Sequence, residues 1–212
     1  MVTDPKPKYA SPPRISPGFL LRQMPTGLSK EGREALEAAR RSEPITTALL
    51  GIFNSNNGYK GFQNALANID YTLADIEKIC RKIEINHKTG LFISAAINKI
   101  ITENDTVTLD FNRKEVNELA YRLQKGHVIL NGPAGDAAGE FMSDSASLTI
   151  NGNAGDFVGH GMSGSASLTI KQIAGDDVGC FSSGGTIKIE GDIGSIADSC
   201  KAEVFHKGKR VR

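Results

Sequence analysis

The sequence contains 212 residues, of which 39% are hydrophobic and 6% are aromatic, and it has no tryptophan. This length allows one or two domains with a buried core. The formal net charge of +1 excludes a strong overall bias toward nucleic acid or a membrane surface, and no apolar run approaches the roughly 20 residues that cross a bilayer.

The charges are unevenly distributed along the chain. Residues 127–200 carry nine carboxylates and two lysines, a net charge of −7, whereas the C-terminal sequence KAEVFHKGKRVR is basic. The basic tail and the basic N-terminal segment lack the interleaved aromatic residues of a nucleic-acid reader, so nucleic-acid binding is not favoured. Either segment can instead pack against the acidic part of its own or a neighbouring chain.

Cysteine and histidine spacing predicts neither a disulfide nor a zinc site. Cys80, Cys180 and Cys200 form no CxxC pair, and the start of the chain lacks a signal-peptide pattern. This usage is typical of free thiols in a reducing compartment, so we expect a cytoplasmic protein. The four histidines show neither the HExxH pattern nor a paired spacing, so no metal site is predicted from them.

The N-terminal part of the chain is expected to contain an arm followed by a helical region. Six of the eight prolines fall within the first 25 residues, which predicts an extended arm over residues 1–26. The next region, residues 27–126, is expected to be mainly helical. Apolar periodicity and the capping box of Thr72 and Asp75 predict helices over residues 30–42, 45–53, 59–68, 73–83 and 91–102.

The end of this region is predicted to be a strand–helix–strand linker. Val107, Leu109 and Phe111 alternate as in a strand. Asn112 then begins a predicted helix, which ends at Gly126 and has an apolar face made of Val116, Leu119, Ala120 and Leu123. A second strand follows at once, over residues 127–130, and we expect it to run parallel to the first.

Residues 127–200 repeat with a period of 20. SLTINGNAGDFVGHGMSGSA aligns with HVILNGPAGDAAGEFMSDSA before it and with SLTIKQIAGDDVGCFSSGG after it. Each copy has one short strand with alternate apolar residues, and short repeats of this kind form stacked coils. The predicted fold class is therefore α+β: an N-terminal helical region, then a short right-handed single-stranded parallel β-helix over residues 127–212 with a basic C-terminal tail.

Two rows of glycines are predicted to form the corners of the coils, where glycine adopts positive φ at little cost. The first row is Gly135, Gly155, Gly175 and Gly194, and the second is Gly139, Gly159 and Gly179. The alternative is a phosphate-binding loop, which needs one glycine cluster at the start of a helix. Here the cluster recurs and is followed by strands, so we favour corners.

Asp136, Asp156 and Asp176 occupy the same position in consecutive copies. Two carboxylates about 5 Å apart repel by roughly 3 kcal/mol at an effective dielectric constant near 20. Either each aspartate accepts backbone N–H bonds at its own corner, or a cation bridges the ladder. We favour the first, because calcium-binding repeat helices use a nine-residue repeat that this sequence lacks.

The repeats NGPAGDAAGEFMS, NGNAGDFVGHGMSG and AGDDVGCFSSGGTIKIEGDIG resemble a known module. It is the GXGXG β-helix, found as the C-terminal domain of glutamate synthase large subunits and in one of the subunits of formylmethanofuran dehydrogenase. The resemblance covers residues 127–200. It implies a structural element that makes subunit contacts, while flavin, glutamine-hydrolysing, iron–sulfur and molybdopterin chemistry lies in other domains.

The repeats contain no predicted catalytic or cofactor-binding residue, and GHGMSGS differs from the G-x-S-x-G nucleophile elbow. We therefore expect a non-catalytic structural or accessory protein, without a cofactor, whose β-helix contacts a protein partner or further copies of the chain. The alternative hypothesis is an oxidoreductase-associated subunit that binds a cofactor or an amide substrate through its helical half.

Overall fold

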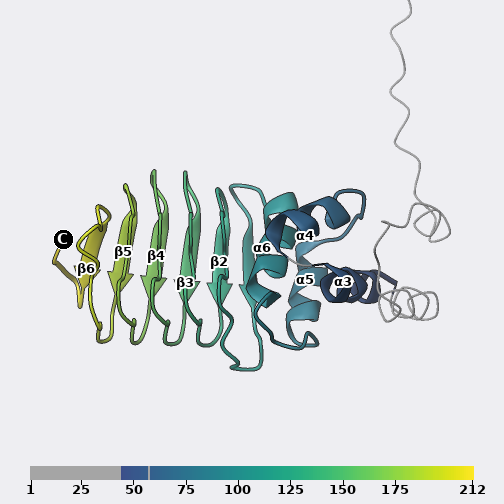
Figure 1. Ribbon diagram of the computed structural model, residues 1–212, viewed down its shortest axis with the longest axis horizontal. Helices are drawn as coiled ribbons and strands as arrows, with labels where there is room; N and C mark the ends of the chain where they lie inside the picture. Colours follow the sequence, from purple (N-terminus) through teal and green to yellow (C-terminus); the bar gives the residue numbers. More distant parts are fainter. Residues whose placement is uncertain (1–43, 57) are drawn as a thin grey trace, which may run out of the picture.

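The computed structural model describes residues 44–56 and 58–212. The arm predicted over residues 1–26 and the helix predicted over residues 30–42 lie outside this part of the chain. Figure 1 shows helices gathered at one end and a row of strands extending away from them, stacked one beyond the other. The fold is α+β, with a few helices followed by a parallel β-helix of about 5 coils.

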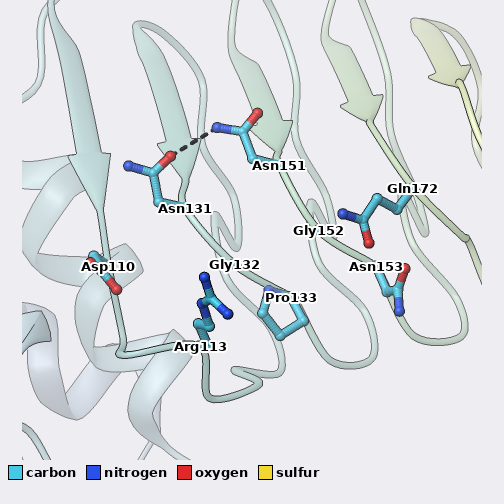
Figure 2. Close-up of a pocket in the computed structure, with 9 residues that line it drawn as sticks. All are labelled: Asp110, Arg113, Asn131, Gly132, Pro133, Asn151, Gly152, Asn153 and Gln172. Atoms are coloured by element: carbon cyan, nitrogen blue, oxygen red, sulfur yellow. Dashed lines mark hydrogen bonds between the residues drawn. The ribbon is translucent and has the colours of Figure 1, made fainter.

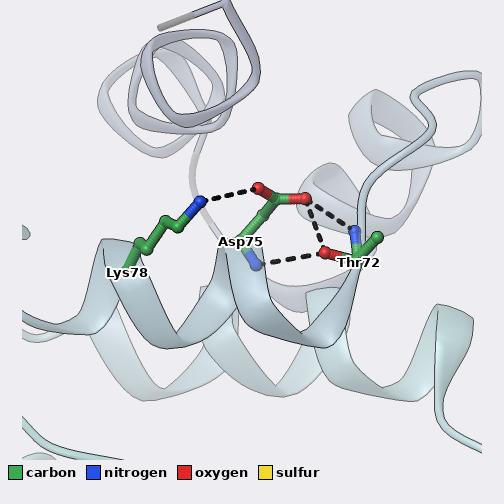
Figure 3. A network of polar contacts seen from close by, with 3 residues as sticks. All are labelled: Thr72, Asp75 and Lys78. Atoms are coloured by element: carbon green, nitrogen blue, oxygen red, sulfur yellow. Dashed lines mark hydrogen bonds and ion pairs between the residues drawn. The ribbon is translucent and has the colours of Figure 1, made fainter.

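The helical end contains four described helices: α3 (Pro44–Ser55), α4 (Tyr59–Leu66), α5 (Leu73–Cys80) and α6 (Thr89–Ile100). They confirm the helices expected from apolar periodicity in this part of the chain. The predicted capping box also forms (Figure 3), because the Thr72 hydroxyl accepts the Asp75 N–H at 3.3 Å and the Asp75 carboxylate accepts the Thr72 N–H at 3.0 Å. These bonds fix the start of α5.

Large aromatic side chains fill the core of the helical end. Phe53, Phe62 and Phe92 are almost fully buried, and the Phe92 ring lies 5.4 Å from Phe53 and 5.2 Å from Phe62 between centroids. The same hydrophobic core continues without interruption into the β-helix. The two regions therefore share one buried interior.

Each coil of the β-helix contributes one strand to a single sheet in chain order. The strands are β1 (Thr106–Leu109), β2 (His127–Leu130), β3 (Ser147–Ile150), β4 (Ser167–Ile170), β5 (Thr186–Ile189) and β6 (Glu203–His206). They pair in parallel, and Leu130, Ile150 and Ile170 are aligned and buried. This confirms the aliphatic spine on which the repeat prediction depends.

The helix predicted between Asn112 and Gly126 is wrong, because residues 106–126 form the first coil of the β-helix. Asn112 and Arg113 have φ of 55° and 62°, outside the helical region. The backbone pairs with the second coil instead: the Glu118 N–H donates to Asp136 O at 2.9 Å. The apolar residues of this segment recur every three or four positions, a spacing that a helix and a coil of this shape share.

Helix α6 covers the open end of this first coil. The Ser94 hydroxyl accepts the Tyr121 N–H at 3.0 Å and donates to Glu118 O at 3.3 Å, and the Asn98 amide donates to Tyr121 O at 2.9 Å. Gly90 permits the close approach, since a Cβ there would collide with the backbone of coil residues 117–119. Helix α6 thus satisfies backbone groups that an uncovered coil would leave unpaired.

A short hairpin closes the other end. Strand β7 (Lys209–Arg210) pairs antiparallel with β6, and the Arg212 guanidinium donates to Cys200 O at 2.8 Å. Lys207 pairs with Asp192 at 2.6 Å. The C-terminal basic tail therefore packs on the acidic β-helix of its own chain, one of the two arrangements that the charge distribution suggested. None of the described helices combines the length and apolar character needed to span a membrane.

Candidate functional site

The aspartates at equivalent positions form a ladder of hydrogen bonds between coils. Asp136 Oδ1 accepts the Asp156 N–H at 2.9 Å, and Asp156 Oδ1 accepts the Asp176 N–H at 2.7 Å. Backbone N–H bonds thus stabilise the carboxylates, but each N–H comes from the next coil, which corrects the prediction of a bond within the same corner. Asn117 begins the ladder by accepting the Asp136 N–H at 3.1 Å. The sequence did not reveal this role, because the apolar spacing around Asn117 predicts a helix.

The glycine before each aspartate is required by close packing. A Cβ at Gly155 would collide with Asp136 Oδ1 and with the Gly135 backbone, and the same holds one coil further for Gly175. The row formed by Gly135, Gly155, Gly175 and Gly194 therefore makes room for the ladder and does not adopt positive φ. The second row, Gly139, Gly159 and Gly179, has φ of 76°, 70° and 70° as predicted.

The described part of the chain can be set against the requirements of a metal site and of a reactive thiol. It contains no group of three or more His, Cys, Asp or Glu side chains able to hold a metal ion. Cys80, Cys180 and Cys200 are free thiols, as predicted. Burial raises the pKa of the Cys80 thiol above its ordinary value, which disfavours the nucleophilic thiolate.

A polar groove with a volume of about 650 Å³ runs beside the ends of strands β1 to β4. We call it the amide groove, because amide side chains from three coils line it (Figure 2). The complete lining is Asp110, Arg113, Asn131, Gly132, Pro133, Asn151, Gly152, Asn153 and Gln172.

A difference in corner length creates the amide groove. The corner after β1 has six residues, 110–115, whereas the equivalent corner after β2 has three, residues 131–133. The longer first corner forms one side of the groove. The next two corners pack closely on each other, because Gly152 lies directly against the Gly132 backbone, where any Cβ would collide. The glycine backbone of Gly132 and Gly152 therefore lines the groove together with Pro133 and the amide and charged side chains.

The hydrogen bonds inside the amide groove leave several polar groups free to meet a ligand. Asn151 Nδ2 donates to Asn131 Oδ1 at 2.8 Å, and Asn153 Oδ1 accepts the Ile173 N–H at 3.2 Å. The Arg113 guanidinium makes no hydrogen bond or ion pair with any described residue. The lining contains no histidine, cysteine, serine or lysine. It contains one carboxylate, Asp110, together with four amides and a guanidinium, and these groups donate and accept hydrogen bonds.

A row of aromatic rings follows another side of the molecule, from α4 to the fourth coil. We call it the aromatic row; neighbouring rings in it lie 5.0, 5.9, 5.5 and 5.8 Å apart between centroids, in the order Tyr59, Tyr121, Phe141, His160 and Phe181. The two phenylalanines of the row are exposed: Phe141, in its middle, is 39% exposed, and Phe181, at its outer end, is 69% exposed.

The aromatic row is held by its neighbours in the coils. The Arg122 guanidinium lies 5.4 Å from the Tyr121 ring centroid and 5.7 Å from that of Phe141. Gly161 leaves room for the Phe141 ring, which a Cβ at that position would strike. The sequence did not reveal the row, because its members occupy two different positions of the repeat and one of them lies on α4.

Two hollows on the helical side are smaller than the amide groove. One, of about 260 Å³, is lined in part by Tyr59, Asn98 and Arg122, and the other, of about 280 Å³, by Leu66, Lys99 and their neighbours. Ligand pockets ordinarily begin at about 300 Å³. These hollows give no support to the hypothesis that the helical half binds a cofactor.

Comparisons of the chain with protein-family models, with curated proteins and with solved structures find no match. Within residues 44–56 and 58–212, we infer a function from the amide groove and the aromatic row.

Proposed function

We propose that this protein is a non-catalytic structural or accessory subunit, whose aromatic row docks onto a protein partner or onto a second copy of the chain. The observation that carries the proposal is the exposure of Phe181 and Phe141, at 69% and 39%, in a continuous row of rings. Exposed aromatic side chains gathered on one surface are typical of the energetic centres of protein interfaces.

The β-helix presents these rings on a rigid surface. Gly159 and Gly179, at the corner that precedes them, donate backbone N–H bonds of 2.9 Å to the preceding coil. A surface that is ordered before docking loses little conformational entropy on association, which favours affinity. The resemblance of the repeats to GXGXG modules supports the same proposal, since those modules contact other subunits.

The test compares the full chain with a Phe141→Ser/Phe181→Ser variant and with an Ile173→Ser control. Ile173 is 50% exposed and lies at a corner outside the aromatic row, so the control removes a comparable exposed apolar side chain. Light scattering measures self-association, and quantitative mass spectrometry of the tagged chain isolated from its native cells measures stoichiometric partners.

The proposal expects a complex of defined stoichiometry that the double variant weakens at least tenfold and the control leaves intact. A wild-type chain that stays monomeric and isolates without a stoichiometric partner would overturn it. A complex that survives the double variant would exclude the aromatic row as its contact surface.

A further inference from the structure

We propose that the amide groove binds an acidic oligosaccharide, a function separate from docking through the aromatic row. Its side chains come from four successive coils: Arg113 from the first, Asn131 from the second, Asn151 and Asn153 from the third, and Gln172 from the fourth. The groove therefore runs along the axis of the β-helix, and its ligand must be elongated in the same direction.

The spacing of the groove fits a chain of sugar rings. Paired strands of successive coils lie about 4.8 Å apart, a spacing similar to the length of one sugar unit. A sugar chain that lies along the axis would therefore meet about one polar side chain of the groove at each ring. The groove volume of about 650 Å³ lies well inside the usual range of about 300 to 1,000 Å³ for ligand sites. The groove has room for more than one monosaccharide.

The free polar groups match hydroxyls and a carboxylate. Asn131 Nδ2 and Asn151 Oδ1 are not used in their mutual hydrogen bond, and Asn153 Nδ2 is also available. Figure 2 shows the Gln172 amide lying beside Asn153. Amides both donate and accept, as sugar hydroxyls do. The Arg113 guanidinium at the other end offers a bidentate partner for a carboxylate. Asp110 also lines this end, and its carboxylate accepts the Asn112 N–H at 2.8 Å, so Arg113 is the group that can pair with an acidic ligand.

Two other classes of elongated ligand fit the groove less well. An extended peptide binds by adding to an exposed strand edge or by filling pockets for alternate side chains, whereas β2, β3 and β4 are each paired on both sides and the groove is lined by no large aliphatic or aromatic side chain. Single-stranded nucleic acid needs several cations and stacking aromatics. The groove offers Arg113 as its single cation and has no aromatic ring in its lining.

The test uses calorimetry on the full chain at neutral pH with three probes: oligogalacturonate, its methyl ester, and a neutral cello-oligosaccharide. We expect oligogalacturonate to bind about tenfold or more tightly than its ester, because only the free acid forms the charge-assisted bond to Arg113. Arg113→Ala should abolish this preference. Lys114→Ala removes the same charge one residue away, outside the groove lining, and should leave the preference unchanged.

A second variant keeps the proposal testable if Arg113→Ala disturbs the first corner. Asn151→Asp is nearly isosteric and places a negative charge in the middle of the groove, so it should weaken oligogalacturonate binding at least tenfold while the melting temperature stays near that of the wild type. The Phe141→Ser/Phe181→Ser variant should bind the probe normally, which separates this proposal from docking through the aromatic row.

Several outcomes would overturn the proposal. They are no binding of oligogalacturonate, equal binding of the acid and its methyl ester, and equal losses for Arg113→Ala and Lys114→Ala. Tighter binding of a single-stranded RNA homopolymer or of an extended peptide than of oligogalacturonate would assign the groove to another class of ligand.

Discussion

The helical end and the β-helix satisfy their backbone polar groups in different ways. At the helical end, side-chain bonds to backbone groups at the borders of elements are individual: Thr72 caps α5, while Ser94 and Asn98 bond the first coil. In the β-helix the same bond is repeated from coil to coil, as Asp136 and Asp156 show. Each inner coil therefore bonds to the coil before it and to the coil after it, so a substitution in one coil affects its contacts with both neighbours.

The largest expected effect comes from a cavity placed in either region. Leu168 and Phe92 are 0% and 1% exposed, and changing either residue to alanine should cost about 2 to 5 kcal/mol of unfolding free energy. Leu168 lies between Leu148 and Ile187, so Leu168→Ala should accelerate hydrogen exchange in the coils on both sides. Phe92→Ala should act first on α4 and α6. Identical hydrogen-exchange profiles for the two variants would contradict the claim that the helical end and the β-helix respond differently to a cavity.

A smaller but more specific effect is expected at the aspartate ladder. A Cβ at Gly135 would collide mainly with the Asn117 side chain, so Gly135→Ala should cost about 1 to 3 kcal/mol through overpacking. Adding Asn117→Ala should recover part of this loss, although Asn117→Ala alone removes a hydrogen bond. Urea denaturation of the two single variants and the double variant measures the coupling.

Gly208→Ala is the matched control for backbone strain alone. Gly208 has φ of 78° with no atom within 4 Å of a built Cβ, so this variant should cost only about 1 to 2 kcal/mol, the penalty of left-handed backbone. It should show no coupling with Asn117→Ala. Additive losses for Gly135→Ala and Asn117→Ala would contradict the packing explanation of the glycine row.

The cover over the first coil should contribute about 1 to 3 kcal/mol. Ser94→Ala leaves the partly buried Tyr121 N–H without its acceptor, and an unsatisfied donor at a buried site costs about that much. Ser55→Ala removes a hydroxyl that, among residues 44–56 and 58–212, bonds to Gly51 O of its own helix, and it should change the stability by less than about 0.5 kcal/mol. Equal melting temperatures for the two variants would show that α6 does not serve as a cap.

The smallest effect concerns the pH dependence of stability. Burial, assisted by the nearby charge of Glu140, raises the pKa of Glu118 above its ordinary value. The folded state therefore holds a proton that the unfolded state has lost, so stability falls as the pH rises from the ordinary glutamate pKa through the raised one. Glu118→Gln should stabilise the protein at neutral pH by less than about 1 kcal/mol, because the side chain is largely solvated. The gain should vanish in acid, and a gain that is independent of pH would refute the assignment.

The sequence predicted the parts of the fold that depend on local pattern. The Thr72 capping box and the spine of Leu130, Ile150 and Ile170 follow from spacing alone, and both are present. The first coil was missed, because its residues have diverged from the repeat and three-to-four spacing of apolar residues also suits a helix. Within the coils, the repeat located the corners but left open which N–H each aspartate accepts, because that depends on the stacking of coils.

Neither surface proposed as functional could be predicted from the repeat. The amide groove exists because the first corner is longer than the next two and because Gly132 and Gly152 let those two corners pack closely together. That difference is visible only once residues 106–126 are recognised as a coil. The aromatic row combines Tyr59 from a helix with rings from two repeat positions, which become neighbours only when the coils stack beside α4.

Photo-cross-linking at position 181 tests most directly the central claim that the aromatic row is a contact surface. A benzoylphenylalanine residue replaces Phe181 in the full chain, and the same residue at the exposed Lys188 of β5 is the control. Irradiation in the native cells should give one discrete adduct at position 181, with a second copy or a single partner, and none at position 188. No adduct at position 181, or the same adducts at both positions, would contradict the account.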